Sequence, residues 1–354
     1  MVEQLKSFLK KGEAALIMSE ENIAYFTSFH SSNGYLVVTG DKSYFLTDSR
    51  YVEAAQDKIK TVDEVLLLRS MKDDLYDLLD KLGIKKLHIE SERTTVKRLN
   101  DIKKATALRQ RVICNGKLDE AICTIRIKKS ENEKNKIIRA QRIAEKAFDH
   151  ILSFISTEKT EKEIALELDF FMLKNGADAL SFETIAVSGK NSSKPHGVPS
   201  DKKIENGDFI TMDFGAVVDF YHSDMTRTVA VGEVSSKQIE VYETVLEAQL
   251  RAIEAIKAGK ICNEIDKISR DIIASKGYGK NFGHGLGHGV GVEIHEAPSL
   301  NPSSSYILEE GNIVTVEPGI YLPGEFGVRI EDMGAVTETG FENFTKSEKK
   351  LIVL

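Results

Sequence analysis

The chain is short of cysteine. Three occur in 354 residues, and none of them stands in a CxxC or CxxH spacing. A zinc-thiolate site needs such close pairs, and a disulfide framework needs more cysteines than this. We therefore expect Cys114, Cys123 and Cys262 to be separate thiols in the core or at the surface.

Long apolar runs and long basic runs are missing as well. The N-terminal stretch MVEQLKSFLKKGEAALIM is interrupted by charges every few residues, so it lacks the apolar core of a signal peptide and is too polar to span a membrane. No run of lysine or arginine is long enough to follow a duplex, and the net charge is −7 with a pI near 5.8. We expect a cytoplasmic protein that binds neither membranes nor nucleic acids.

The remaining composition is that of a soluble globular enzyme, with 41% apolar and 29% charged residues. Because 354 residues exceed the usual size of one core, we predict two domains, 1–118 and 119–354. In the first, short apolar runs predict strands and residues 71–83 predict a helix, whereas residues 61–68 fit either. The predicted fold class is α/β (α+β), with a small α/β N-terminal domain.

From Ser130 onward the same series of elements occurs twice. Each half has a capping pair opening a long amphipathic helix, a second helix that stops at a glycine, and two strand-like segments able to form a hairpin. Equivalent positions lie 101 to 107 residues apart: Ser130 and Ser235, Gly176 and Gly277, Asp213 and Glu317, Asp224 and Glu331. Such near-constant spacing indicates two halves related by a pseudo-two-fold axis, whose hairpins face one cleft.

Four carboxylates are expected in that cleft. Asp213 and Asp224 lie in apolar, β-branched surroundings where a lone buried carboxylate is costly. Glu317 and Glu331 occupy the same relative places in the second hairpin. The four together require positive charge. Metal ions would supply it, and an internal salt-bridge network with nearby arginines is the structural alternative.

The glycine-rich segment GHGLGHGVGVEIHEAP favours metal ions over a salt-bridge network. It adds His288 as a nitrogen ligand, and its glycines permit close backbone approach to the site. Carboxylates with one imidazole suit Mn, Co, Fe or Zn. Two ions sharing carboxylates can hold a water as hydroxide and stabilise the oxyanion that forms when it attacks a carbonyl. A phosphate loop is excluded, because GHGLGHG lacks both the GK[ST] ending and a following acidic residue at dinucleotide spacing.

Other histidines share these glycine-containing segments. We expect functional roles for His196, His295 and His284, which lie in sequence beside the carboxylates or the histidine ligand. For His222 and His30 a structural role is as good an interpretation.

Seven motifs occur together in one order. They are Pro195-His196-Gly197, Met212-Asp213-Phe214-Gly215, Asp224-Met225-Thr226-Arg227-Thr228, Gly287-His288-Gly289-Val290-Gly291, His295-Glu296-x-Pro298, Glu317-Pro318-Gly319-Ile320-Tyr321 and Gly327-Val328-Arg329-Ile330-Glu331-Asp332. Over residues 119–354 this set closely resembles the Xaa-Pro peptidases, the prolidase and aminopeptidase P branch of the pita-bread metallopeptidases. More weakly, Thr47-Asp48-Ser49-Arg50-Tyr51 resembles the creatinase-type N-terminal domain of that family.

The resemblance implies a dinuclear metal site. Asp213 would chelate one ion, Asp224 and Glu331 would bridge both, and His288 with Glu317 would complete the other. The ions would be Mn, with Co, Zn or Fe as alternatives.

The resemblance also implies roles around the metals. Glu317 would shuttle the proton of the bridging water, and His196 and His295 would bind the scissile carbonyl or the tetrahedral intermediate. His284, Tyr321 and Arg329 would lie around the proline pocket or behind the metal ligands. The substrates would be proline-containing peptides cleaved before proline.

One residue departs from part of the family. Some prolidases carry an arginine directly after His-Glu-x-Pro to hold the carboxylate of a dipeptide, and this chain has Ser299 there. Longer substrates therefore stay open, and the prediction covers Xaa-Pro aminopeptidase and Xaa-Pro dipeptidase alike. A methionine aminopeptidase is the enzymatic alternative, and a metal-free binding module on the same fold is the non-enzymatic one. The resemblance further implies a homodimer, with the aromatic-rich segment at residues 22–35 as a candidate contact.

Overall fold

The computed structural model describes residues 1–106 and 109–354. The chain divides into two units, residues 1–126 and 127–354. Helix α6 (Lys117–Arg126), within which the predicted division after residue 118 falls, belongs to the first unit. Among the described residues, no helix has both the length and the apolar character of a membrane span. The three cysteines are free thiols, as expected.

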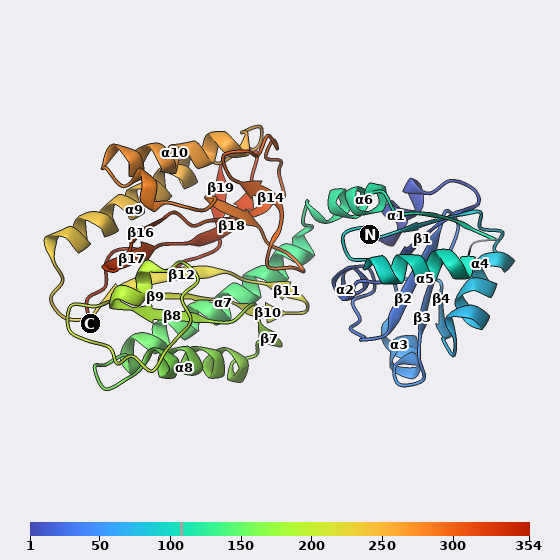
Figure 1. The fold of residues 1–354 in the computed structure, drawn as a ribbon, viewed down its shortest axis with the longest axis horizontal. Helices are drawn as coiled ribbons and strands as arrows, with labels where there is room; N and C mark the ends of the chain where they lie inside the picture. Colours follow the sequence, from blue (N-terminus) through green and yellow to red (C-terminus); the bar gives the residue numbers. More distant parts are fainter. Residues whose placement is uncertain (107–108) are drawn as a thin grey trace. The chain divides into compact units, whose positions relative to one another are not determined.

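A six-stranded mixed sheet forms the centre of the N-terminal unit, in the order β4-β3-β2-β1-β5-β6 (Figure 1). The ambiguous residues 61–68 contain a strand, because they pair in parallel with the third strand. The elements are α1 (Val2–Phe8), β1 (Glu13–Ile17), α2 (Glu20–Thr27), β2 (Gly34–Thr39), β3 (Ser43–Thr47), α3 (Val52–Lys58), β4 (Glu64–Leu67), the π-helical turn η1 (Met71–Tyr76), α4 (Asp77–Lys81), β5 (Lys86–Ile89), α5 (Val96–Thr106), β6 (Arg111–Ile113) and α6.

The C-terminal unit consists of the two predicted halves. In Figure 1 the helices α7 (Glu131–Phe154) and α8 (Glu161–Lys174) lie on one side of the strands, and α9 (Ser236–Ala255) and α10 (Cys262–Ser275) on the other. Each helix pair has its own hydrophobic core against the strands. Capping boxes start α7 at Ser130 and α9 at Ser235, as the sequence predicts. The two-fold repeat is therefore confirmed in the fold.

Both predicted hairpins are formed. In the first half, β9 (Phe209–Phe214) pairs antiparallel with β12 (Met225–Ala230). In the second half the hairpin is interrupted, so that β15 (Ile313–Val316) pairs with β18 (Asp332–Val336), and β16 (Gly319–Leu322) with β17 (Phe326–Arg329). The other strands are β7 (Ala179–Leu180), β8 (Ile185–Ser188), β10 (Ala216–Val218), β11 (Tyr221–His222), β13 (Gly287–Gly289), β14 (Glu296–Leu300) and β19 (Phe341–Asn343), with short 3-10 helices η2 (Gly189–Ser193) and η3 (Gly279–Asn281).

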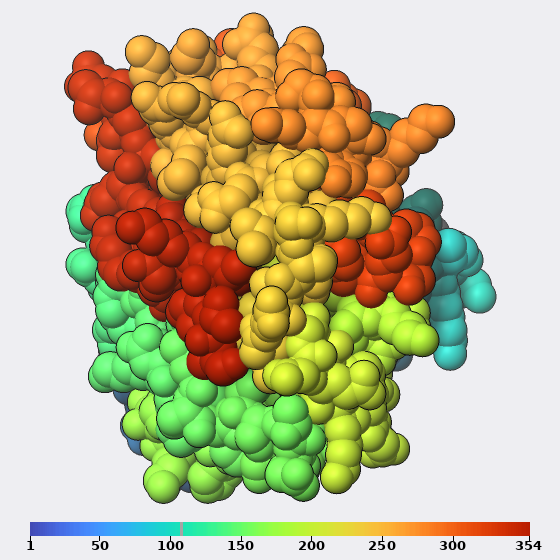
Figure 2. All heavy atoms as spheres, turned by 90° about the vertical axis from the view of Figure 1, so that its left-hand side faces the viewer, coloured from blue at the N-terminus to red at the C-terminus, as the bar shows by residue number. Residues whose placement is uncertain are grey.

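The end of the chain joins the two halves of this unit. Ala230 of β12 accepts a hydrogen bond from the amide of Leu354, and its own amide donates to the carbonyl of Ile352. On the side of α9, the hydroxyl of Tyr242 donates to the carbonyl of Lys349 at 2.9 Å. Figure 2 shows these last residues in red, at the surface between the green helices of the first half and the gold residues of α9. The C-terminal segment is thus part of the packing of the unit.

Candidate active site

A cavity of about 530 Å³ lies between the two hairpins, and all five predicted metal ligands line it. Asp213 is in β9, whereas Asp224 directly precedes β12. Glu317 directly follows β15, and Glu331 directly precedes β18. His288 is the central residue of β13. Each hairpin therefore delivers two carboxylates at the ends or interruptions of its strands.

Three of the five ligands approach closely enough to share one ion. Single ligand atoms of Asp224, His288 and Glu331 all lie within 4.8 Å of one another. Nε2 of His288 is 3.5 Å from Oδ2 of Asp224 and 3.6 Å from Oε1 of Glu317. This separation is too long for hydrogen bonds and suits ligand atoms that surround a cation.

Two buried carboxylate oxygens lack a hydrogen bond. Within the described residues, Oδ1 of Asp213 and Oε1 of Glu331 have no partner, although both are shielded from solvent. The second oxygen of Glu331 accepts from the hydroxyl of Thr226 at 2.8 Å. An unpartnered, buried carboxylate oxygen is costly. Its presence on two residues that line one cavity fits a metal site.

The carboxylates also repel one another. Burial raises the pKa of Asp224 well above its usual value, and the charges of Glu331, Asp213 and Glu317 raise it further. Burial likewise raises the pKa of Glu331, with Glu317 and Asp213 adding to it, and raises that of Glu317 to about 8. Divalent cations would favour the ionised forms and remove this cost. The donor set, carboxylates with one imidazole, suits Mn, Co, Fe or Zn.

His288 has the form that a ligand requires. Burial, and then the neighbouring His295, lower the pKa of His288 to about 4, so its ring is neutral at pH 7. Its Nδ1 lies 3.1 Å from the carbonyl oxygen of Gly289, and a proton on Nδ1 donated there leaves the lone pair of Nε2 pointing at the carboxylates. The ring of His295 packs edge-on against that of His288, with centroids 4.4 Å apart.

Arg329 connects the first hairpin to the second. Its Nη2 donates to Oδ2 of Asp213 at 2.6 Å, its Nε to Thr226 at 3.0 Å, and its Nη1 to the hydroxyl of Tyr321 at 2.8 Å. That hydroxyl is 3.0 Å from Nε2 of His284. Burial, and then the charge of Arg329, lower the pKa of His284 to about 4. Tyr321 does not line the cavity itself but connects Arg329 with His284.

The arginines do not replace the metals as partners of the four carboxylates. Among the described residues, Arg329 forms an ion pair with Asp213 alone of the four. Arg227 pairs with Asp332, which is not a predicted ligand. A salt-bridge network therefore leaves Asp224, Glu317 and Glu331 without a permanent cation.

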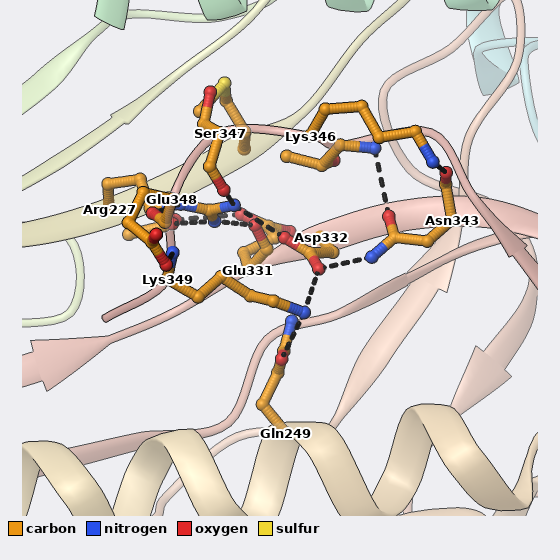
Figure 3. A network of polar contacts seen from close by, with 12 residues as sticks. Arg227, Gln249, Glu331, Asp332, Asn343, Lys346, Ser347, Glu348 and Lys349 are labelled. Carbon is orange, nitrogen blue, oxygen red and sulfur yellow. Dashed lines mark hydrogen bonds and ion pairs between the residues drawn. The ribbon is translucent and has the colours of Figure 1, made fainter.

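Arg227 nevertheless supports the site from behind (Figure 3). Its guanidinium donates to the carbonyl of Glu331 at 2.6 Å and to that of Thr226 at 2.9 Å, so it ties the backbones on both sides of the cleft together. It also donates to the carboxylate of Asp332 at 2.8 Å. The position of Glu331 thus depends on a buried network that lies outside the cavity.

The glycines around His288 are required by close backbone approach, as expected. A Cβ on Gly287 would lie 2.1 Å from the carbonyl oxygen of Thr315, and one on Gly289 would lie 2.3 Å from that of Ala297. Neither position accepts a side chain without moving the backbone. The glycines therefore let β13 pass between its neighbours and bring His288 to the carboxylates.

The structure adds residues that the sequence did not single out. Phe182 and Ile185 line the cavity, and Asn301 lines it beside Ser299. Apolar residues upstream of Pro195-His196-Gly197 could have pointed to Phe182 and Ile185 as residues of the cavity. No sequence signal pointed to Asn301.

The predicted residues His196 and His295 line the same cavity and are exposed to solvent.

Comparisons with known proteins agree with this site. Residues 135–338 match the model of metallopeptidase family M24, and residues 6–121 match that of the creatinase/prolidase N-terminal domain. The chain belongs to metallopeptidase family M24. It is therefore a hydrolase, and its pita-bread domain with a creatinase-like N-terminal domain confirms the predicted fold.

Relatives of this M24 peptidase include a curated Xaa-Pro dipeptidase of Pyrococcus horikoshii, 39% identical over 99% of this chain and 98% of the relative. A solved Xaa-Pro dipeptidase from Bacillus anthracis is 43% identical, with a TM-score of 0.94 over 100% of this chain and 99% of that one. A solved X-Pro aminopeptidase from Thermotoga maritima is 37% identical, with a TM-score of 0.91 over 99% and 100%. The chain resembles both kinds of enzyme over its full length.

Proposed function

We propose that this M24 peptidase is a dinuclear-metal exopeptidase that hydrolyses the peptide bond preceding proline. The observation that carries the proposal is the single cavity that gathers five metal-type ligands and three further histidines. The names of the relatives, Xaa-Pro dipeptidase and X-Pro aminopeptidase, give the substrate class. Proline-containing peptides are accordingly the proposed substrates.

Two divalent ions, Mn in the first place and Co, Zn or Fe as alternatives, would be held by the five ligands. Asp224 and Glu331 would be shared between them, Asp213 would complete one set, and His288 with Glu317 the other. When bound, such a pair lowers the pKa of a shared water so that a hydroxide is available near neutral pH, and it polarises the scissile carbonyl.

Glu317 is proposed to carry the proton during the reaction. Its half-buried side chain lies beside His288, at the wall of the cavity. It would accept the proton of the attacking water and return it to the leaving proline nitrogen, which must be protonated to depart. Its position at the wall of the cavity, beside the other proposed ligands, supports both transfers.

His196 and His295 are proposed to bind the scissile carbonyl and the tetrahedral intermediate. Both line the cavity. An imidazole N–H aimed at the developing oxyanion stabilises the transition state more than the ground state. The mechanism therefore predicts that loss of either histidine lowers kcat.

Arg329, Tyr321 and His284 are proposed to act around the metal ligands and the proline pocket. Arg329 is buried and bonded to Asp213, so it fixes the orientation of that carboxylate. The hydroxyl of Tyr321 accepts from Arg329 and lies 3.0 Å from Nε2 of His284, so it connects Arg329 with His284, which lines the cavity. His284 and Arg329 are both proposed to face the substrate, because both line the cavity, and Tyr321 connects them.

A dedicated site for Xaa-Pro bonds has a physical reason. The bond before proline is a tertiary amide without an N–H, so an enzyme that holds its substrate through backbone hydrogen bonds loses a donor there. In this cavity the apolar side chains of Phe182 and Ile185 provide a surface that needs no such donor.

The length of the substrate depends on residues near Ser299. Of the described residues that line the cavity, Arg329 is the one with a permanently positive side chain, and it is bound to Asp213. Ser299 and Asn301 offer neutral hydrogen-bonding groups instead of an ion pair for a terminal carboxylate. Both an Xaa-Pro dipeptide and an Xaa-Pro-Yaa tripeptide are therefore candidate substrates.

A peptide panel tests the proposal. The Mn-loaded enzyme is assayed with an Xaa-Pro dipeptide, an Xaa-Pro-Yaa tripeptide, the matching Xaa-Ala-Yaa tripeptide and Met-Ala-Ser. We expect cleavage of at least one proline peptide and none of the alanine peptide, and the ratio of the first two separates dipeptidase from aminopeptidase. Failure to cleave either proline peptide with Mn or Co overturns the proposal, and release of Met from Met-Ala-Ser points to a methionine aminopeptidase.

We also propose that the enzyme is a cytoplasmic homodimer. In the candidate contact at residues 22–35, Tyr25, Phe26 and Phe29 are buried within the N-terminal unit, whereas Ser28, His30 and Ser32 are exposed. A contact would therefore use the exposed polar side chains of this segment and not the rings of Tyr25, Phe26 and Phe29. Sedimentation is expected to give a dimer at micromolar concentration, and a monomer would contradict it.

A further inference from the structure

The segment of residues 188–200 forms one wall of the active-site cavity. Pro195, His196 and Gly197 of this segment line the cavity. His196 is exposed, and within the described part of the chain its ring has no hydrogen bond. Because no hydrogen bond of the ring holds it, the place of this ring depends on the backbone that carries it.

Both ends of the segment are held by one carboxylate, that of Glu161. Its Oε1 accepts from the backbone N–H of Ser188 at 2.7 Å and from the hydroxyl of Ser188 at 3.0 Å. Its Oε2 accepts from the N–H of Ser200 at 3.0 Å and from the hydroxyl of Ser200 at 2.6 Å. The side-chain amide of Asn191 donates to both oxygens, at 3.1 and 3.2 Å.

The carboxylate of Glu161 is unusual for an ionisable group, because the residue is fully buried. Among the described residues it has no ion pair, and the nearby Lys202 donates to Ser188 and Asp208 instead. A buried carboxylate without a cation is tolerated only when its lone pairs are filled by donors, as they are here. Because the acceptor is charged, each of these hydrogen bonds is stronger than a neutral one.

The middle of the same segment is fastened to the strand that carries Arg329. The hydroxyl of Ser192 accepts from the N–H of Gly327 at 2.9 Å. Nη1 of Arg329 is 3.3 Å from the carbonyl oxygen of Pro195. The segment is thus held at its ends by α8 and in its middle by β17, next to the metal ligands.

We propose that Glu161 is a positioning residue for His196: its buried carboxylate closes the segment of residues 188–200 and so places the His196 ring at the scissile carbonyl. This proposal rests on the role of His196 in the proposed function. Glu161 itself does not line the cavity and touches no reacting group.

The second half of the unit holds its histidine segment in a related way. Asp266 of α10 is buried, and its Oδ1 accepts from the N–H of Leu286 at 3.0 Å. Asp266 also pairs with Arg270, which donates to the carbonyls of Phe282 and His284. In both halves, then, a carboxylate on the second helix anchors the backbone next to a cavity histidine.

The test is the variant Glu161→Gln in the Mn-loaded enzyme, with an Xaa-Pro peptide as substrate. The amide keeps the shape of the side chain but replaces one acceptor oxygen by a donor that faces other donors. Because small displacements of catalytic groups cost up to about 100-fold, we expect kcat to fall by about 10- to 100-fold. The change in KM should stay within about twofold and bound Mn should not change, because Glu161 contacts none of the five metal ligands.

The matched control is Glu163→Gln, the same substitution two residues further along α8. Glu163 is exposed and accepts from the N–H and hydroxyl of Thr160 in the capping box, without touching residues 188–200. We expect kcat within about twofold of the wild type for this variant. A general effect of losing a glutamate at the start of α8 would appear in both variants.

A double-mutant cycle separates positioning from mere stability. In a His196→Ala background there is no ring left to position, so Glu161→Gln should lower kcat/KM by less than about twofold. Equal losses in both backgrounds, or an unchanged kcat in the single variant, overturn the proposal. If Glu161→Gln does not fold, Asn191→Ala carries the same cycle, because its amide joins the carboxylate to the turn before His196.

The failure of the proposed function gives a different result. An active enzyme in which His196→Ala keeps its full kcat removes the role of His196, and the positioning role of Glu161 with it. A wild-type enzyme that cleaves no proline peptide removes both proposals together. A strong effect of His196→Ala with a neutral Glu161→Gln removes the positioning role alone.

Discussion

Replacing Arg227 by methionine should strongly destabilise the C-terminal unit. Arg227 is almost fully buried, and so is its ion-pair partner Asp332 (Figure 3). The guanidinium also donates to four backbone carbonyls, those of Thr226, Glu331, Ser347 and Glu348, at 2.6 to 2.9 Å. The variant keeps a side chain of similar length but removes every one of these donors.

The size of the effect follows from what stays unpaired. Removing one partner of a buried ion pair costs about 3–5 kcal/mol, because the other charge stays buried. Asp332 keeps two donors, Lys349 at 2.7 Å and Asn343 at 2.6 Å, which limits this loss. The four carbonyls lose their donors as well, at about 1 kcal/mol or more each where solvent does not reach them. The two donors that Asp332 keeps lower the cost at the ion pair and the four carbonyls add to it, so we expect a net loss of about 3–5 kcal/mol in the free energy of unfolding.

Thermal unfolding measures this loss. For a unit of this size, 1 kcal/mol corresponds to about 2–4 °C in Tm, so we expect the Tm to fall by about 6–20 °C. The loss should persist with a chelator present, because Arg227 contacts carbonyls and Asp332 and no ligand side chain. The control is Arg251→Met, in which the ion pair with Glu254 is exposed, with 58% and 70% of the two side chains accessible. This control should cost less than about 1 kcal/mol. Equal shifts in the two variants would refute the account of the buried network.

Two further predictions concern single carboxylates. Glu317→Gln should lower kcat for an Xaa-Pro peptide by at least about 100-fold, because the variant lacks the proposed proton carrier. Glu325→Gln, at an exposed ion pair with Lys237, should leave kcat unchanged. A Glu317 variant with wild-type kcat would rule out the proton-transfer role. Burial raises the pKa of Asp169 in the folded protein, so its ionised form at neutral pH costs more when folded than when unfolded. Asp169→Asn should therefore raise the Tm at pH 7. This gain in Tm should disappear as the pH falls below about 3.9, the pKa of an aspartate in the unfolded chain. A gain that stays constant down to pH 3 would contradict this cause.

That four carboxylates line one cavity could be predicted from the sequence, because local signals mark them. Asp213 and Asp224 stand among apolar β-branched residues, where burying a lone carboxylate costs free energy unless a partner neutralises it. The repeat then placed Glu317 and Glu331 in equivalent hairpins, and both hairpins are formed. Hydrophobic periodicity and hairpin spacing are local signals, and this is why they pointed to the correct elements.

Other features depend on contacts between distant parts of the chain. Glu161 is the first residue of α8, where an acidic residue is ordinary, and its special environment arises only when Ser188 and Ser200 fold back onto it. The strand at residues 64–67 is fixed by pairing with β3 and not by its own pattern. Asn301 reaches the cavity because β14 pairs with β13, which places the end of β14 beside the cleft. None of these contacts can be predicted from the residues near them in sequence.

The stoichiometry of bound metal tests the central claim most directly. The protein is freed of metal with a chelator, dialysed against excess Mn, separated from unbound ions and analysed for Mn per chain by mass spectrometry. Five ligands of which two are shared predict two ions per chain. A value of one, or none, would contradict the assignment of Asp213, Asp224, His288, Glu317 and Glu331 to a dinuclear site.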